Sequence, residues 1–237
     1  VPCVPLAADD AECHKQVIEG VGHLLWRRPL TPEEVTPIVA IAQAAGSEYG
    51  SFNLGAEYAL LTLPQAPYFL YTIEVGLPDT DHPEWRKLTA PELATRMSLF
   101  LIDQTPDAAL LDAAEKGGLQ SEDEIRDAAK AMLADPAARK ALTSFYDVFF
   151  KLKELPTFTK IPEIFPEWNA ALAESTRQET LTFLDDLVWN QNADYRTMFT
   201  ADYTFIDANL AGLYGVAAPS GAGFQRVTLP ANQKRSG

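Results

Sequence analysis

Apolar residues recur along most of the chain at the three- and four-residue spacing that places side chains on one face of an α-helix. In the first segment Val17, Val21 and Leu24 share a face, while Glu12 and Glu19 lie off it. The same spacing returns in segments 52–63, 93–101, 125–133 and 166–190. The last segment has no breaker after its first proline and predicts a helix of about 22 residues, roughly 33 Å long.

Helix-start signals agree with this periodicity. A cap residue, an early proline or a glutamate at the third helical position occurs five times, in TPEE (31–34), TAPE (89–92), TPD (105–107), SEDE (121–124) and DP (135–136). Strand patterns are few and weak. YFLYTIEV (68–75) could be a helix end or one short strand, and FQRVTL (224–229) alternates weakly. We therefore expect an all-α fold, a multi-helix bundle with long ordered loops that could include one minor β-hairpin.

The loop GLPDTDHPEWRK (76–87) divides the pattern in two. It predicts an N-terminal helical region, residues 1–80, and a central helical domain, residues 81–217. The segment from residue 218 opens with the glycine- and proline-containing turn APSGAGF. No internal repeat of 20 to 50 residues accompanies this division, which argues against a solenoid.

The net charge of −14 limits the classes of partner that the chain is expected to bind. An acidic surface repels nucleic-acid phosphates and anionic membrane surfaces, so we expect no nucleic-acid partner. No stretch approaches the roughly 20 apolar residues that a membrane-spanning helix needs, so we expect no membrane span. A basic protein partner is compatible with the charge.

Cys3 and Cys13 are the two cysteines of the chain. A disulfide between them would tie an N-terminal extension to the first helix and would suit an exported protein. A free pair in a reducing compartment is the alternative. Cys13-His14 ends like a haem-attachment CxxCH motif, but Asp10 stands where the first cysteine is required. We expect no covalently bound haem on this chain.

Two arginines, Arg27 and Arg28, stand between an apolar run and a proline. Paired arginines bind anions, but they also complement the dipole at a helix C-terminus. Glu33 and Glu34 follow at the start of the next predicted helix, within reach across a short corner. The four side chains therefore predict a structural ion cluster, with an anion site as the alternative.

Signatures of catalysis are missing. The chain has neither G-x-S-x-G nor HExxH, and its three histidines show no metal-ligand spacing, so we expect no metal site. The segment ADYTFID offers Asp202, Tyr203 and Asp207 as functional candidates, with a buried tyrosine bonded to an acid as the structural interpretation. Arg177 and Glu179 on the long helix are two further candidates, for which intrahelical contacts are the structural interpretation.

Aromatic residues are dense in two later segments. Phe145, Tyr146, Phe149 and Phe150 follow one another on one predicted helix face and its flank, and Tyr195 and Phe199 come later, with Trp168 and Trp189 nearby. They predict a helical-bundle core. An apolar ligand pocket or an electron-transfer interface is the alternative.

Several segments occur in the order expected of a known group. They are RRPLTPEE (27–34), YALLTLPQAPYFLYTIE (58–74), LTAPELATRMSLFLIDQTPDAALLDAAEKGGL (88–119), AMLADPAARKAL (131–142), TADYTFIDANLAGLYGV (200–216) and FQRVTLP (224–230). The chain resembles a planctomycete-type family of bacterial secreted domains of unknown function, commonly associated with c-type cytochrome modules. The chain departs from that family's central signature at Leu99 and Ile102, where aromatic residues are usual.

The resemblance implies context rather than a mechanism. It implies export to the periplasm or the extracellular space, and c-type haem carried by a partner or downstream module. It also implies that residues 218–237 begin a further region that is cut or missing here. Our first hypothesis is a helical scaffold or partner-contact part of an exported bacterial oxidoreductase assembly. If the chain belongs to an enzyme, that enzyme is a haem-linked oxidoreductase complex.

Two other functions stay open. The chain could be a non-catalytic structural or interaction subunit that docks a basic partner through its acidic surface. A fainter alternative is a hydrolase whose active site is shared with a missing C-terminal part. The sequence names no substrate and no catalytic residue for any of these functions.

Overall fold

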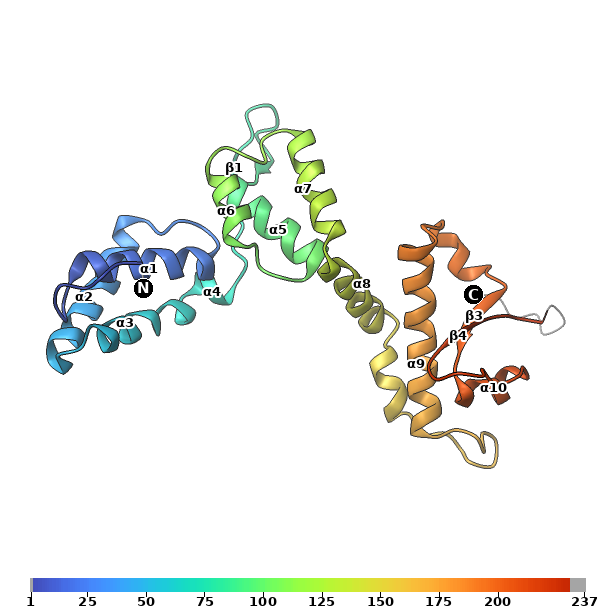
Figure 1. Cartoon of the computed structure of the whole chain (residues 1–237). Coiled ribbons are helices and arrows are strands. Elements are labelled where there is room, and N and C mark those ends of the chain that lie inside the picture. Colours follow the sequence, from blue (N-terminus) through green and yellow to red (C-terminus); the bar gives the residue numbers. More distant parts are fainter. Residues whose placement is uncertain (1, 231–237) are drawn as a thin grey trace. The chain divides into compact units, whose positions relative to one another are not determined.

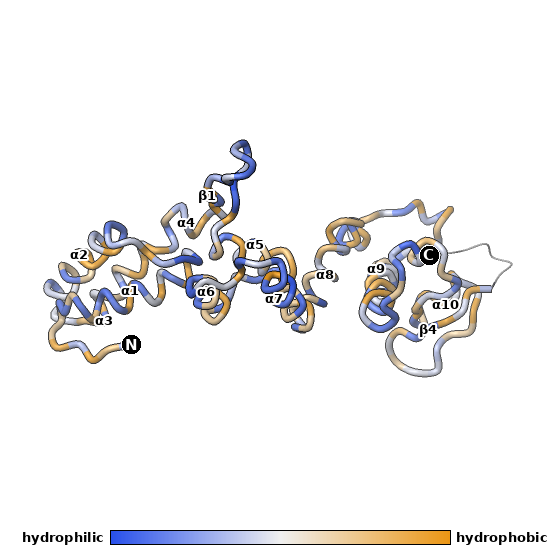
Figure 2. Tube along the Cα trace, turned by 90° about the horizontal axis from the view of Figure 1, so that it is seen from above, coloured by the Kyte–Doolittle hydropathy of each residue, from blue (hydrophilic) through white to orange (hydrophobic). Residues whose placement is uncertain are grey.

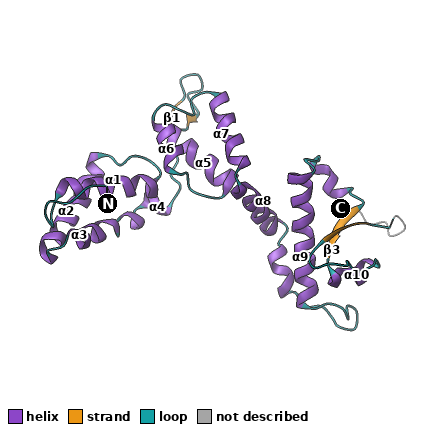
Figure 3. Cartoon of the chain, in the orientation of Figure 1, coloured by secondary structure: helices purple, strands orange, loops and turns teal. Residues whose placement is uncertain are grey.

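The computed structural model describes residues 2–230. The chain divides into two compact units, Val1–Ala134 and Asp135–Gly237, called unit 1 and unit 2 below. Helices dominate both units, and the strands form two antiparallel sheets of two strands each over the described range (Figure 3). The predicted all-α fold class is therefore confirmed, with minor hairpins.

Unit 1 consists mainly of helices, and the segment 71–89 between its fourth and fifth α-helices contains a pair of short strands. Its elements are α1 (Ala11–Trp26), α2 (Pro32–Tyr49), α3 (Phe52–Leu60), the 3₁₀ turn η1 (Leu63–Gln65), α4 (Pro67–Leu70), β1 (Leu77–Pro78), β2 (Arg86–Lys87), α5 (Ala90–Ile102), α6 (Ala108–Glu115) and α7 (Glu122–Ala134). Helices α1, α2 and α3 pack side by side (Figure 1). Their shared core includes Ile18, Trp26, Ile38, Ala42 and Leu63.

Unit 2 is organised around its long helix. Its elements are α8 (Pro136–Phe149), the 3₁₀ turn η2 (Leu152–Thr157), α9 (Ala170–Asp185), the π-helical turn η3 (Asp186–Asn190), the 3₁₀ turn η4 (Tyr195–Phe199), β3 (Tyr203–Ile206), α10 (Ala208–Tyr214) and β4 (Gln225–Thr228). Strand β3 pairs antiparallel with β4, with Tyr203 opposite Thr228. The inner face of α9 supplies Leu181, Phe183 and Leu184 to the main core of this unit.

Local sequence explains most helix starts. The Glu34 carboxylate accepts the Thr31 backbone N–H at 2.9 Å, and Glu92 does the same for Thr89 at 2.8 Å. At SEDE the Glu124 carboxylate accepts the Ser121 backbone N–H at 2.9 Å. The start predicted from TPD moves by two residues, because the side chain that caps α6 belongs to Asp107.

The long helix predicted over 166–190 is present as α9 and η3, which together run from Ala170 to Asn190. Along the helices, hydrophobic and hydrophilic positions are interspersed (Figure 2). The segment at 68–75 is a helix end rather than a strand, because α4 ends at Leu70 and residues 72–75 have no regular secondary structure. FQRVTL contains β4, as its alternation predicted.

The N-terminal segment is held against α2 by a close backbone contact. A Cβ added at Gly46 would lie 2.1 Å from the Ala8 carbonyl oxygen, so only glycine permits this approach. The Cys3–Cys13 disulfide, with a Cα–Cα separation of 5.6 Å, ties the same segment to α1. The predicted disulfide is thus present in the structure.

The predicted domain bounds and the predicted absence of a membrane span can be set beside the structure. The sequence predicted a domain boundary near residue 80. The two compact units of the structure meet at a different position, after Ala134. The predicted region 218–237 extends over residues 231–237, which lie outside the described residues. Across residues 2–230, no helix has the length and apolar content that a bilayer crossing requires.

Candidate functional site

The corner between α1 and α2 contains the predicted arginine pair. Helix α1 ends at Trp26 because Arg27 takes a left-handed backbone conformation, with φ of 59°. The Arg28 guanidinium donates two hydrogen bonds to Glu34, of 2.7 and 2.9 Å. These hydrogen bonds raise the pKa of Arg28 and lower the pKa of Glu34. The bidentate pair closes the corner in a fixed geometry.

Arg27 and Glu33 do not join that pair. The Arg27 guanidinium donates to the carbonyls of Tyr68, at 2.7 Å, and Tyr71, at 3.1 Å. Burial lowers the pKa of Arg27. Glu33 is exposed and has no salt bridge among the described residues, because neighbouring helical side chains point about 100° apart and Glu34 faces the corner. Of the predicted four-residue cluster, the structure forms only the Arg28–Glu34 pair.

A hollow of about 370 Å³ adjoins this corner. Arg28 stacks on the Tyr68 ring, 4.3 Å from its centroid, and forms part of the wall. Glu74 and Glu92 line the same hollow. Both guanidinium groups already donate to acceptors of the chain, and the two carboxylates repel anions. The arrangement is that of a structural corner rather than an anion site.

In unit 2 the predicted candidates fall into separate networks. Glu179 of α9 is buried and accepts hydrogen bonds from the hydroxyls of Thr204, at 2.7 Å, and Tyr214, at 2.5 Å. These contacts join α9 to β3 and α10. The sequence offered Glu179 as a functional candidate, with intrahelical contacts as the structural interpretation, whereas in the structure its carboxylate connects three elements.

Asp207 caps α10 and also reaches α9. Its carboxylate accepts the Ser175 hydroxyl at 2.6 Å and the backbone N–H groups of Asn209 and Leu210. Burial alone would raise the pKa of Asp207, but these hydrogen bonds bring the pKa below its ordinary value. The carboxylate is therefore an ionised cap with its oxygens occupied.

Tyr203 is buried and lies away from Asp207 in the hydrogen-bond pattern. Its hydroxyl accepts from the Gln191 side chain at 2.8 Å, and the Arg226 guanidinium lies 3.8 Å from its ring centroid. Burial raises the pKa of Tyr203. Asp202 is exposed, and its backbone carbonyl accepts the Leu229 N–H at 2.6 Å, extending the pairing of β3 and β4. The ADYTFID candidates thus do not converge.

Arg177 joins α9 to α8. It donates to both oxygens of the buried Asp147, at 2.9 and 2.7 Å, and to Glu174 at 2.8 Å. The hydrogen bonds to Asp147 raise the pKa of Arg177, and the pKa of Asp147 is lowered in return. The pair is a structural connection between two helices.

The aromatic residues of α8 and η4 lie differently from the core that we predicted. Tyr146 is buried, but Phe145, Phe149, Phe150, Tyr195 and Phe199 are exposed. Ring contacts join the three phenylalanines to one another and Tyr195 to Phe199, and Phe150 and Phe199 line one hollow of about 310 Å³. We call these five residues the aromatic surface. The helix has two aromatic faces, because residues 145 and 149 and residues 146 and 150 repeat at the same spacing.

One group of side chains was not predicted. His23 of α1 lies beside Asp112 and Glu115 of α6, all within unit 1. The two acids share a helix face three residues apart, which the sequence could have shown. The histidine is 92 residues from Glu115, and no local signal links them.

These observations define the class of protein. It is a mainly α-helical chain of two compact units, in which the candidates Arg28, Arg177, Glu179 and Asp207 make structural connections, and whose second unit exposes an aromatic surface. Residues 88–216 match the family described as "PSD4: Protein of unknown function (DUF1592)", and residues 13–74 match "PSD5: Protein of unknown function (DUF1595)". The first match covers more than half of the chain, which therefore belongs to the DUF1592 family. Neither a curated protein nor a solved structure matches it significantly.

Proposed function

We propose that the chain is the helical scaffold and partner-contact part of an exported bacterial oxidoreductase assembly associated with c-type haem. The aromatic surface of unit 2 is the observation that carries this proposal. Its partner is a separate or downstream polypeptide of the same assembly, which bears the haem. The chain itself supplies the helical frame and the contact, and the redox chemistry belongs to the partner.

The physical case for a protein contact rests on the cost of exposing these rings. Phe149 and Phe199 are each 60% exposed, and Phe145 is 54% exposed, although each would gain by leaving water. Contiguous exposed apolar groups are typical of binding sites, and aromatic side chains are enriched at protein interfaces. The hollow between Phe150 and Phe199 offers a place for an anchoring side chain of the partner.

The compartment and the haem have different support. The Cys3–Cys13 disulfide supports export, because such bonds persist in oxidising compartments. The haem-bearing partner rests on the family resemblance described from the sequence. The net charge of −14 favours a partner with a basic face, which is also the chemistry of the second candidate function, a non-catalytic docking subunit.

The test starts from the native material. The full chain isolated from its source should co-purify with a chain that shows a Soret absorbance. The double variant Phe149→Ser/Phe199→Ser should lower the recovery of that chain at least about tenfold, the effect of losing roughly 1.4 kcal/mol of binding. Phe100→Ser is the matched control, because Phe100 is 81% exposed on α5 of unit 1.

Four results would count against the proposal. A colourless, monomeric native protein would reject the haem-bearing partner. A double variant that changes only the self-association of the chain would assign the aromatic surface to a second copy. A double variant that lowers the unfolding temperature while leaving recovery unchanged would show that the rings pack within the chain. Steep weakening of a colourless complex by salt would favour the docking subunit instead.

A further inference from the structure

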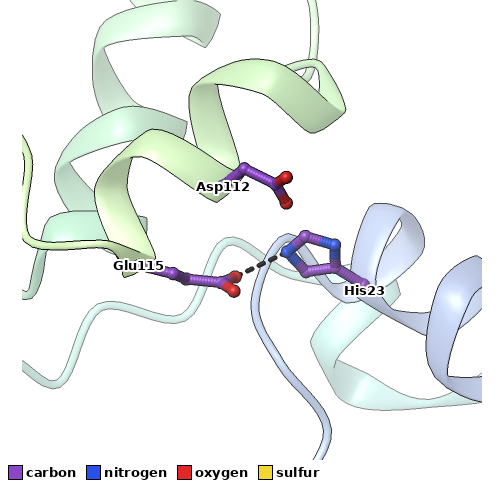
Figure 4. A group of neighbouring side chains, drawn as sticks. All are labelled: His23, Asp112 and Glu115. Atoms are coloured by element: carbon purple, nitrogen blue, oxygen red, sulfur yellow. Dashed lines mark hydrogen bonds and ion pairs between the residues drawn. The ribbon is translucent and has the colours of Figure 1, made fainter.

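Three potential metal ligands converge in unit 1. His23 lies in the last turn of α1, and Asp112 and Glu115 lie on one face of α6 (Figure 4). One ligand atom from each of the three residues lies within 4.8 Å of the other two. The His23 Nε2 and Glu115 Oε1 atoms are 2.5 Å apart, and the Asp112 carboxylate points toward the same space.

The placement of the two acids gives independent support for a cation. Glu115 is the last residue of α6, where the partial negative charge of the helix dipole disfavours a carboxylate. Like charges three residues apart on a helix also repel each other. Lys116 approaches Asp112 at 3.3 Å, but both of these groups are more than half exposed. Both the helix dipole and the repulsion between the two carboxylates therefore disfavour this placement. A cation bound between the carboxylates would make their closeness favourable.

The donor set selects the kind of cation. One imidazole nitrogen and two carboxylate oxygens suit zinc, whereas calcium and magnesium take oxygen ligands. The His23 and Glu115 side chains are 19% and 28% exposed and the Asp112 side chain is 53% exposed, so two of the three ligands are partly withdrawn from water and a solvent molecule can still reach the site. We propose that His23, Asp112 and Glu115 form a divalent transition-metal site, with zinc as the fitting ion.

The geometry needs a small adjustment to hold the ion. Tetrahedral zinc at about 2.0–2.1 Å separates its ligand atoms by roughly 3.4 Å. The His23–Glu115 pair opens by roughly 1 Å to meet this requirement, and the Asp112 oxygen moves inward. Such changes are within the reach of side-chain rotation. The ion would then link α1 to α6, which lie in the two segments matched by the separate families.

Calorimetric titration of the full chain with zinc chloride, after removal of metals by chelation, tests the site. We expect one equivalent bound and a higher unfolding temperature with zinc than without it. His23→Gln and Glu115→Gln should each lower the affinity at least about tenfold, since loss of even an indirect ligand partner costs that much. The two variants are separate because either could fail to fold, and circular dichroism of the metal-free proteins checks this.

The matched control is His82→Gln. His82 also faces a carboxylate, with its Nδ1 atom 3.9 Å from Glu84, but both side chains are more than half exposed and belong to one loop. Zinc affinity should be unchanged in this variant. Binding that survives undiminished in folded His23→Gln or Glu115→Gln, or that disappears in His82→Gln, would overturn the proposal. So would the absence of stoichiometric zinc binding to the unmodified chain.

Discussion

The Arg28–Glu34 pair should stabilise unit 1 more than an exposed ion pair does. Its side chains are 28% and 20% exposed, against 86% and 53% for the Arg196–Asp194 pair. A partly buried bidentate pair lies between the exposed value, about 0–1 kcal/mol, and that of buried charged hydrogen bonds, about 1.5–3 kcal/mol. Stacking of Arg28 on an aromatic ring adds about 0.5–1 kcal/mol. Arg28→Ala should therefore cost about 2 kcal/mol.

Thermal and urea unfolding of the full chain, followed by circular dichroism, measure this cost. A loss of about 2 kcal/mol lowers the unfolding temperature of a unit of this size by roughly 5–10 °C. Arg196→Ala is the control and should change stability by less than about 0.5 kcal/mol. A double-mutant cycle of Arg28→Ala with Glu34→Gln isolates the pair and should give a coupling of at least about 1 kcal/mol.

The pH dependence of the same pair has a definite sign. The hydrogen bonds from Arg28 hold the pKa of Glu34 below its ordinary value. The stabilisation is therefore complete above about pH 4.5 and is lost as the pH falls toward the lowered pKa of the folded state. Glu34→Gln should remove that part of the acid dependence. Equal effects of Arg28→Ala and Arg196→Ala, or a coupling near zero, would refute this reasoning.

Four further changes should have distinct effects on the unfolding free energy. Gly46→Ala should destabilise the chain by about 1–3 kcal/mol, because its Cβ meets a backbone carbonyl, whereas Gly20→Ala, with nothing within 4 Å, should stabilise it by about 0.5–1 kcal/mol; urea titration separates these signs. Cys3→Ser/Cys13→Ser should cost about 2–3 kcal/mol, and reductant should lower the melting temperature of only the unmodified chain. Asp147→Asn should cost about 2–4 kcal/mol at pH 7 and less as the pH falls below 3.8 toward the lowered pKa of the folded Asp147 carboxyl group, as acid titration would show.

The sequence predicted those features whose causes are local. The boxes that begin at Thr31, Thr89 and Ser121 contain both partners within four residues, so their geometry follows from the chain itself. The pairing of the disulfide was also predictable, because Cys3 and Cys13 are the two cysteines of the sequence. The fold class followed from the summed evidence of such segments.

The features that sequence reasoning missed depend on tertiary placement. Phe145 and Tyr146 are neighbouring aromatic residues, yet Phe145 is exposed and Tyr146 is buried, because the rest of unit 2 covers only one face of α8. Helical spacing identifies the residues that share one face of a helix, but it does not show whether another element packs against that face. The approach of His23 to Glu115 likewise depends on how α1 and α6 pack. Glu33 and Glu34 are adjacent in sequence, but their side chains point about 100° apart on the helix, and only Glu34 faces Arg28.

The Glu179 carboxylate has a consequence for how α9 is aligned. Apolar side chains tolerate a helix that slides or rotates slightly, because their contacts have no direction. A shift of one residue would turn Glu179 by about 100° and move it about 1.5 Å along the axis. The carboxylate would then leave the hydroxyls of Thr204 and Tyr214 and face an apolar core. The buried Glu179 carboxylate thus fixes the rotation and axial position of α9, because a shifted helix would leave the charge buried without these two hydrogen bonds.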